Sequence, residues 1–182
     1  KRITLKDGAE VRYTKLALTT GARVRKIPFI GSELAGVFYM RDLNDVKQTH
    51  KFTGPGKSAV IIGGGYIGLE TAASLRKIGM NVTVIEAMER VLQRVTAPEV
   101  SAFYSRIHRE EGVDIRTQAG VEAIVGDQHV QGVRLADGST IPADLVIIGV
   151  GVIPNIELAE AAGLTIDNGI VVDEFATTND PD

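Results

Sequence analysis

The sequence predicts an α/β fold: a Rossmann-like three-layer domain with a central parallel sheet and an added antiparallel β-meander. Three observations indicate this fold. The apolar run Ala59–Ile62 is typical of a buried parallel strand. A glycine-rich turn, a helical pattern and a second apolar run that ends in Glu86 follow it, as in a β-α-β unit. Residues 121–135 alternate between polar and apolar side chains as an antiparallel pair does.

A hairpin pattern at residues 2–21 leads into an apolar run. The Asp7-Gly8 pair marks the turn, and the run covers residues 16–21. The same pattern returns 130 positions later, with Asp137-Gly138 and a run at residues 145–151. We therefore predict two related nucleotide-binding units, each with a hairpin followed by a buried strand that ends in glycine.

Residues 22–56 are predicted to be a connector with surface elements. Pro28, Gly31 and Gly36 interrupt any regular pattern. Apolar spacing near its end indicates one short helix at residues 41–48.

Three glycines with G-x-G-x-x-G spacing, Gly63, Gly65 and Gly68, follow the central strand. The first allows a tight turn, the second leaves the backbone open to a pyrophosphate, and the third lets helix and strand approach closely. The amides of the first helical turn lack helical partners and carry the positive end of the helix dipole. This turn is therefore a predicted phosphate-binding site.

An acid closes the β-α-β unit, because Glu86 follows Gly68 by 18 residues. At this position a carboxylate accepts hydrogen bonds from the hydroxyls of an adenosine ribose. The same charge repels a 2′-phosphate, so we predict NAD(H) rather than NADP(H). The alternative is a glycine turn in a nucleotide-free α/β domain.

Helical spacing predicts the buried faces of two helices. The face of the first helix comprises Ile67, Thr71, Leu75 and Ile78. The face of the second helix comprises Val100, Phe103, Tyr104 and Ile107. Thr96 and Glu99 have the spacing of a capping box at the start of the second helix. We expect His108 on the polar side of this helix, and no metal site.

The remaining elements complete the two units. Residues 113–115 are a predicted third strand, residues 144–149 close the sheet, and residues 154–162 form a short helix. Asn168-Gly169 between two apolar runs predicts a last hairpin.

Composition narrows the function classes. The chain has 182 residues, a formal net charge of -3 and a sequence pI near 5.7, which argues against nucleic acid or an anionic membrane as partner. No apolar run approaches the roughly 20 residues of a membrane span. Without cysteine, the chain forms no disulfide and ligates no iron–sulfur cluster. We expect a cytoplasmic protein, and from Lys1 in place of Met we expect a processed or excised piece.

Three stretches resemble the FAD-dependent pyridine-nucleotide oxidoreductases with two dinucleotide-binding domains. They are residues 63–70, 82–86 and 149–155. Residues 90–113 are similar to a narrower group, the ferredoxin, rubredoxin and putidaredoxin reductases. In that family NADH passes hydride to FAD, and the flavin sends electrons singly to a small iron–sulfur protein.

The resemblance implies an NADH-dependent oxidoreductase that serves an oxygenase. Its cofactors are NAD(H) and, in the complete enzyme, FAD; its partners are NADH and a ferredoxin- or rubredoxin-type protein. It also implies that residues 1–24 and 148–182 are edge segments of an FAD-type domain, and that residues 25–147 are the NAD(H)-binding domain. The family's FAD glycine motif has no counterpart in this chain, so we expect the isolated chain to be inactive.

The resemblance further implies cofactor-binding residues. Those that line the pyrophosphate and the nicotinamide side are Gly63, Gly64, Gly65, Tyr66, Ile67 and Gly68. Glu70 lies near the nicotinamide ribose, Glu86 binds the adenosine ribose, and Arg94 lies beside the adenosine or its phosphates. Val150 and Gly151 lie at the nicotinamide end. The cofactors carry the redox chemistry, so no catalytic side chain is expected.

Alternatives stay open at this point. Glu70 is otherwise a first-turn acid stabilised by the helix dipole, and Arg94 a solvated loop arginine. The protein is otherwise the NADH-binding part of a disulfide reductase or NADH oxidase of the same superfamily, or a non-catalytic NAD(H)-binding module.

Overall fold

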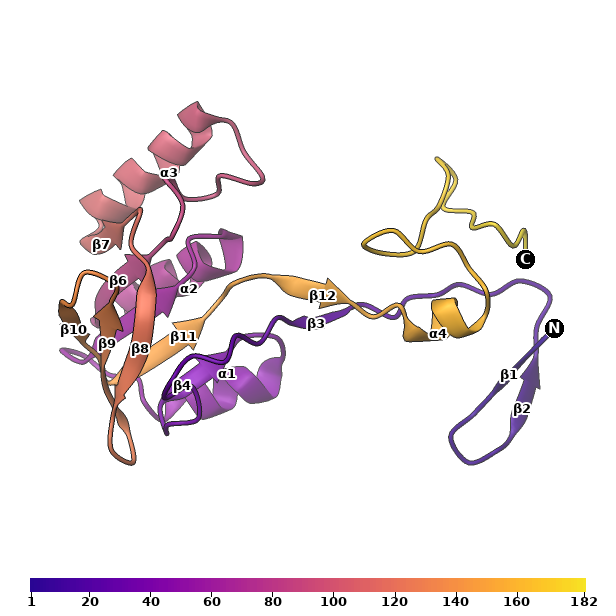
Figure 1. Cartoon of the computed structure of the whole chain (residues 1–182), viewed down its shortest axis with the longest axis horizontal. Coiled ribbons are helices and arrows are strands. Elements are labelled where there is room, and N and C mark those ends of the chain that lie inside the picture. Colours follow the sequence, from indigo (N-terminus) through magenta and orange to yellow (C-terminus); the bar gives the residue numbers. More distant parts are fainter. The chain divides into compact units, whose positions relative to one another are not determined.

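The computed structural model describes all 182 residues, which form two compact units. Unit 2 is Val24–Gly151, and unit 1 combines Lys1–Arg23 with Val152–Asp182. Figure 1 shows the elements of each unit. The assignment of the units to NAD(H)-binding and FAD-type domains stays a prediction. None of the helices is long and apolar enough to cross a membrane.

A five-stranded parallel sheet forms the centre of unit 2. Its order is β4 (Val37–Tyr39), β11 (Leu145–Ile148), β5 (Ser58–Ile62), β6 (Asn81–Ile85) and β7 (Val113–Arg116). Val60 of β5 pairs with Val146 on one side and with Thr83 on the other. The three central strands are buried almost throughout, which explains their near-continuous apolar sequence.

Helices cover one face of this sheet. Helix α2 (Tyr66–Lys77) follows β5, and its Leu69, Ala72 and Leu75 pack with Ile61 and alternate side chains of the neighbouring strands. Helix α3 (Pro98–Glu110) follows β6 and contacts β7. Both helices connect parallel strands, as the predicted β-α-β unit requires.

An antiparallel meander covers the other face. It consists of β8 (Val121–Gly126), β9 (Val130–Leu135) and β10 (Thr140–Pro142), with β9 in the middle. Its buried Val133 and Ile141 pack with Val60 and Ile148 of the parallel sheet. The predicted fold class, a three-layer α/β domain with an added meander, is confirmed.

The predicted buried face of α2 is wrong at its ends. Ile67 and Ile78 are 45% and 43% exposed, whereas Gly68 and Leu69 are buried. A Cβ on Gly68 would lie 2.1 Å from the carbonyl oxygen of Gly63. The close approach of helix to strand at Gly68 therefore sets which face of α2 turns inward. This face differs from the one that the spacing of apolar residues predicts.

The predicted buried face of α3 is wrong except at Tyr104, which is half-buried and packs against the core. Ser101 and His108 are buried, whereas Val100, Phe103 and Ile107 are 40%, 52% and 37% exposed. The helix is thus turned by about one residue relative to its apolar stripe. His108, expected on the polar side, lies inside.

The predicted capping box at the start of α3 does not form. The N-cap is Ala97, and it makes no side-chain cap bond. The Thr96 hydroxyl donates instead to the carbonyl oxygen of Leu92, 3.2 Å away, within the segment before the helix. Pro98 at the first helical position needs no amide partner, so the helix begins without the box.

The connector contains a strand that the sequence pattern did not reveal. Strand β4 pairs in parallel with β11, so β11 completes the sheet from inside rather than at an edge. Helix α1 (Leu43–His50) begins two residues later than predicted, because Asp42 and Asp45 form a reciprocal capping box.

In unit 1, the hairpin of β1 (Arg2–Thr4) and β2 (Glu10–Arg12) repeats the β9–β10 hairpin. Ile3 pairs with Val11, and 130 positions later Val133 pairs with Ile141. The turns also match. Gly8 has φ 87° and Gly138 has φ 85°, and in both the preceding Asp accepts a hydrogen bond from the amide two residues on. The internal repeat is therefore present in the backbone.

The strand that should follow the hairpin in this repeat is absent from unit 1. The prediction of a buried strand at residues 16–21 is wrong, because these residues form no strand and are exposed or half-buried. A strand needs a neighbour for its backbone groups, and Leu16 finds only a single bond, from its amide to the carbonyl oxygen of Asp182. A two-stranded sheet of β3 (Ala22–Val24) and β12 (Val152–Pro154) follows instead.

The rest of unit 1 is short. Helix α4 (Glu157–Ala161) begins three residues later than predicted, because residues 152–154 belong to β12. The turn at Asn168-Gly169 has positive φ at both residues, but only one bridge, Ile166 to Ile170, forms beside it. The expected last hairpin is therefore reduced to its turn.

Candidate functional site

The turn from β5 into α2 is shaped by two glycines that the packing requires. Gly63 has φ 112°, and its amide donates to the carbonyl oxygen of Ile85, 2.8 Å away. A Cβ on Gly63 would lie 2.3 Å from the carbonyl oxygen of Gly149, and one on Gly68 would meet Gly63. Strand ends and helix start are thus in backbone contact, which no larger side chain permits.

Gly65 differs from these two, because nothing in the chain requires a glycine there. Its φ of -78° suits any residue, and no atom lies within 4 Å of the position of a Cβ. The first intrahelical bond runs from the amide of Leu69 to the carbonyl oxygen of Gly65, so the amides of residues 65–68 donate no hydrogen bond within the chain. The turn therefore presents bare backbone donors at the positive end of a helix.

Glu86 lies beside this turn, as its position at the end of β6 predicts. One carboxylate oxygen accepts a hydrogen bond from the amide of Gly64 at 2.8 Å, and the other from the amide of Met88 at 2.9 Å. The side chain is half-buried. Each oxygen keeps a lone pair for a further donor, so the acid is oriented but not saturated.

Other predicted residues lie around the same edge. Tyr66 and Ile67 are 44% and 45% exposed in the first turn of α2, and Glu70 is exposed one turn further along. Val150 is half-buried, and Gly151 has φ 105°, just after β11. Since β11 is the parallel neighbour of β5, these two residues follow the same carboxyl edge, where open α/β sheets bind ligands.

Arg94 is less tightly placed. It is exposed, and its side chain makes no hydrogen bond or ion pair within the chain. It belongs to the segment between β6 and α3, which also carries Glu86. The assignment of Arg94 to the adenosine or its phosphates therefore stays a prediction.

Sequence reasoning missed the support for the turn. The amide of Leu92 donates to the carbonyl oxygen of Gly64 at 2.9 Å, and Val91 and Leu92 are buried. A Cβ on Gly64 would lie 2.9 Å from Val91. The only sequence signal was an apolar pair in a polar segment, and it does not say what the pair contacts.

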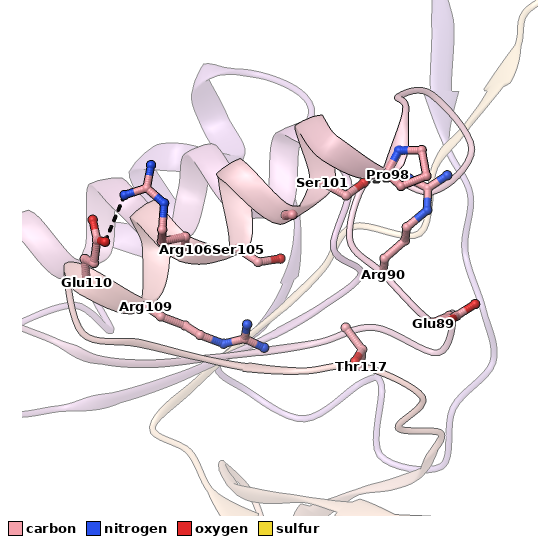
Figure 2. Close-up of a pocket in the computed structure, with 10 residues that line it drawn as sticks. Glu89, Arg90, Pro98, Ser101, Ser105, Arg106, Arg109, Glu110 and Thr117 are labelled. Atoms are coloured by element: carbon pink, nitrogen blue, oxygen red, sulfur yellow. Dashed lines mark hydrogen bonds and ion pairs between the residues drawn. The ribbon is translucent and has the colours of Figure 1, made fainter.

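A surface pocket of about 520 Å³ lies elsewhere in unit 2, and none of the predicted cofactor-binding residues lines it. It is bounded by one side of α3 and by residues that follow β6 and β7 (Figure 2). Three arginines line it, and each has a partner. Arg90 contacts the Ser101 hydroxyl, Arg106 pairs with Glu110, and Arg109 donates to a β7 carbonyl oxygen.

His108 is connected to the first turn of α2 through a chain of ring contacts. Its imidazole stacks on Tyr104 with centroids 6.4 Å apart, and Tyr104 meets the ring of Tyr66 edge-on at 6.1 Å. Burial lowers the pKa of His108, because desolvation disfavours the imidazolium. The ring is therefore a packed group whose neutral form is favoured by burial.

These features fit a dinucleotide. Unpaired amides and the helix dipole suit the two phosphates, and the open position at Gly65 admits them to the backbone. The oriented Glu86 suits the hydroxyls of a ribose. The residues present thus match the chemistry of NAD(H).

Comparison with known proteins covers the whole chain. The family model described as pyridine nucleotide-disulphide oxidoreductase matches residues 1–182. The chain is 48% identical to a putidaredoxin reductase of Pseudomonas putida, over 100% of the chain and 44% of that protein. It is 44% identical to a rhodocoxin reductase of Rhodococcus erythropolis, over 99% and 42%.

Solved structures of reductases also match the chain over nearly its whole length. The reductase in a covalent putidaredoxin reductase–putidaredoxin complex matches with a TM-score of 0.89 and 46% identity, over 99% of this chain and 45% of that one. A ferredoxin reductase from Rhodopseudomonas palustris matches with a TM-score of 0.90 and 40% identity, over 99% and 45%. The chain spans less than half the length of these relatives. The resemblance to the ferredoxin, rubredoxin and putidaredoxin reductases is confirmed, and the chain belongs to the pyridine nucleotide-disulphide oxidoreductase family.

Proposed function

We propose that the chain is the NADH-binding part of a flavoprotein reductase. In the longer protein, hydride passes from NADH to FAD, and electrons pass on to a ferredoxin- or rubredoxin-type iron–sulfur protein that serves an oxygenase. The names of the relatives support the electron acceptor, since several are putidaredoxin, rhodocoxin or rubredoxin reductases.

The observation that carries the proposal is the open position at Gly65. Gly63 and Gly68 are needed by the fold itself, but the free space at Gly65 and the unpaired amides beside it serve nothing inside the chain. A pyrophosphate fills this space and accepts from these amides. Glu86 then accepts from the adenosine ribose and disfavours a 2′-phosphate.

The chain's residues bind and orient, and the nicotinamide and flavin supply the hydride and electron chemistry. The resemblance to the family assigns Tyr66, Ile67 and Glu70 to the nicotinamide half of the ligand, together with Val150 and Gly151. Arg94 lies at the adenosine half. Glu70 would accept from the nicotinamide ribose or carboxamide.

Unit 1 is proposed to be two edge segments of an FAD-type domain. Its hairpin has the register of β9–β10, yet Ile3 and Val11 are 36% and 45% exposed, whereas their counterparts Val133 and Ile141 are 0% and 6% exposed. In unit 2 a parallel sheet covers that face. We propose that a second such sheet covers the β1–β2 face in the longer protein.

A second candidate is the NADH-binding part of a persulfide or disulfide reductase. A structure of an NAD-dependent persulfide reductase from A. fulgidus matches with a TM-score of 0.86 and 37% identity. The higher identities belong to the electron-transfer reductases, which favours the first candidate.

The test is a calorimetric titration of the 182-residue chain with NADH and with NADPH. We expect NADH to bind and NADPH to bind more weakly. No heat with NADH, or a preference for NADPH, would contradict the proposal. Reduction of a ferredoxin by the longer protein, compared with reduction of a disulfide, separates the two candidates.

A further inference from the structure

Arg90 holds together the segment that follows β6 and begins with Glu86. The Arg90 guanidinium donates to the carbonyl oxygens of Thr96 at 3.0 Å and Gln93 at 3.2 Å, and to the hydroxyl of Ser101 at 2.6 Å. In Figure 2 its side chain extends from this segment toward Ser101 near the start of α3. Arg90 thereby ties the segment to itself and to the next helix.

Ser101 completes the tie. It is 1% exposed, and its hydroxyl donates to the carbonyl oxygen of Val91 at 2.7 Å while accepting from Arg90. A buried polar side chain with both roles filled is costly to replace, because its partners then lose their bonds. This explains why α3 turns Ser101, rather than its apolar stripe, toward the segment.

The segment that Arg90 holds together makes two hydrogen bonds to the glycine turn. Leu92 donates to the carbonyl oxygen of Gly64, and Glu86 accepts from the amide of the same residue. Both backbone groups of Gly64 are thus held by this segment. Leu92 has φ 56°, a left-handed conformation that is unfavourable for a residue with a Cβ. Arg90 precedes Leu92 and donates to the carbonyl oxygens of Gln93 and Thr96, which follow it, so its bonds close a loop around Leu92.

We infer that Arg90 and Ser101 are positioning residues for the nucleotide site. They hold Leu92 in its left-handed conformation, and Leu92 in turn holds Gly64 and the phosphate-binding turn in the arrangement that the ligand needs. This inference rests on the proposed function. Neither side chain is required to touch the nucleotide.

Arg76 is a matched control. It also donates to two backbone carbonyl oxygens, those of Glu111 and Met80. Met80 precedes β6, so these bonds lie at the amino end of the strand, whereas the glycine turn lies at the carboxyl end. Arg76→Ala therefore removes an arginine of the same kind without loosening the turn.

The experiment measures NADH affinity, urea unfolding and amide exchange for the 182-residue chain. We expect Arg90→Ala to weaken NADH binding roughly tenfold and Ser101→Ala about threefold, with faster exchange of the Leu92 amide in both. Arg90→Lys should recover part of the affinity. Arg76→Ala should lower stability and leave NADH affinity within about twofold.

The outcomes distinguish failure of the inference from failure of the proposed function. If wild type binds NADH, and Arg90→Ala and Ser101→Ala both bind it as tightly as wild type does, the inference is overturned and the proposed function stands. If Arg76→Ala loses as much affinity as Arg90→Ala, the effect is general destabilisation, which also overturns it. If wild type binds no NADH, the proposed function and the inference fall together. Should Arg90→Ala not fold, the milder Ser101→Ala decides.

Discussion

The carboxylate of Glu86 accepts a hydrogen bond from the backbone amide of Gly64, with 2.8 Å between donor and acceptor. Glu86 directly follows β6, and Gly64 lies in the turn that follows the neighbouring strand β5. The bond therefore places the acid next to the bare amides of the turn. A change at Glu86 alters both the charge at the proposed ribose position and the anchoring of the turn.

We predict that Glu86→Arg reverses the nucleotide preference. NADH binding should weaken by roughly 10- to 100-fold, because the ribose loses its acceptor, and NADPH binding should improve, because a guanidinium pairs with the 2′-phosphate. Dissociation constants for both nucleotides measure this. Glu89→Arg makes the same charge change on an exposed side chain of the same segment, and it should shift both constants by less than about threefold. Equal losses for the two nucleotides in Glu86→Arg would contradict the ribose assignment.

We predict that Gly65→Ala abolishes NADH binding but leaves the fold intact. The new methyl group meets no atom of the chain, so the free energy of unfolding should fall by less than about 1 kcal/mol. It would occupy the space of the pyrophosphate. Gly68→Ala is the contrast, because its Cβ would lie 2.1 Å from a carbonyl oxygen and should cost about 2 kcal/mol or more. Unfolding and titration of both variants test this, and unchanged NADH affinity in Gly65→Ala would refute the phosphate site.

We predict a pH dependence of stability from His108. Burial lowers its pKa in the folded state, so between that pKa and the unfolded value of about 6.5 the unfolded chain binds more protons. The free energy of unfolding should therefore fall as the pH drops below about 6.5. Urea unfolding at several pH values should show a shallower decline for His108→Gln. His129→Gln, which removes an exposed imidazole, is the control. The same slope in wild type and His108→Gln would argue against this origin.

We predict opposite sensitivities for the two copies of the hairpin. Ile141→Asp places a charge in a filled core and should cost about 3 kcal/mol or more. Val11→Asp at the matching position is 45% exposed and should cost less than about 1 kcal/mol in this chain. In the longer protein Val11→Asp should become as costly as Ile141→Asp and should reduce FAD content. Equal tolerance of Val11→Asp in both contexts would count against the FAD-type assignment of unit 1.

Much of the fold could be predicted because its signals are local. The strand before Gly63, the turn, α2 and the strand before Glu86 are each specified by residues within a few positions of one another. The β1–β2 hairpin could be predicted for the same reason, since Asp7-Gly8 forms its turn without help from distant residues. The position of Glu86 beside Gly64 follows from two adjacent parallel strands ending at one edge.

Other features depended on contacts between distant segments. Strand β4 exists because β11, over one hundred residues later, pairs with it, and residues 16–21 form no strand because no such neighbour is present. The apolar stripe of α3 predicted one buried face, but the hydrogen bonds of Ser101 to Arg90 and Val91 selected another.

By itself, the sequence determined the residue types of the candidate site: glycines at a strand-to-helix turn and an acid one strand away, because side-chain size and charge are local properties. Only the tertiary structure decided which glycines the packing needs and which one it leaves open to a ligand. It also decided how the segment after β6 supports the turn. That distinction depends on interatomic distances such as the open space at Gly65, which arise only when separate strands and helices pack together.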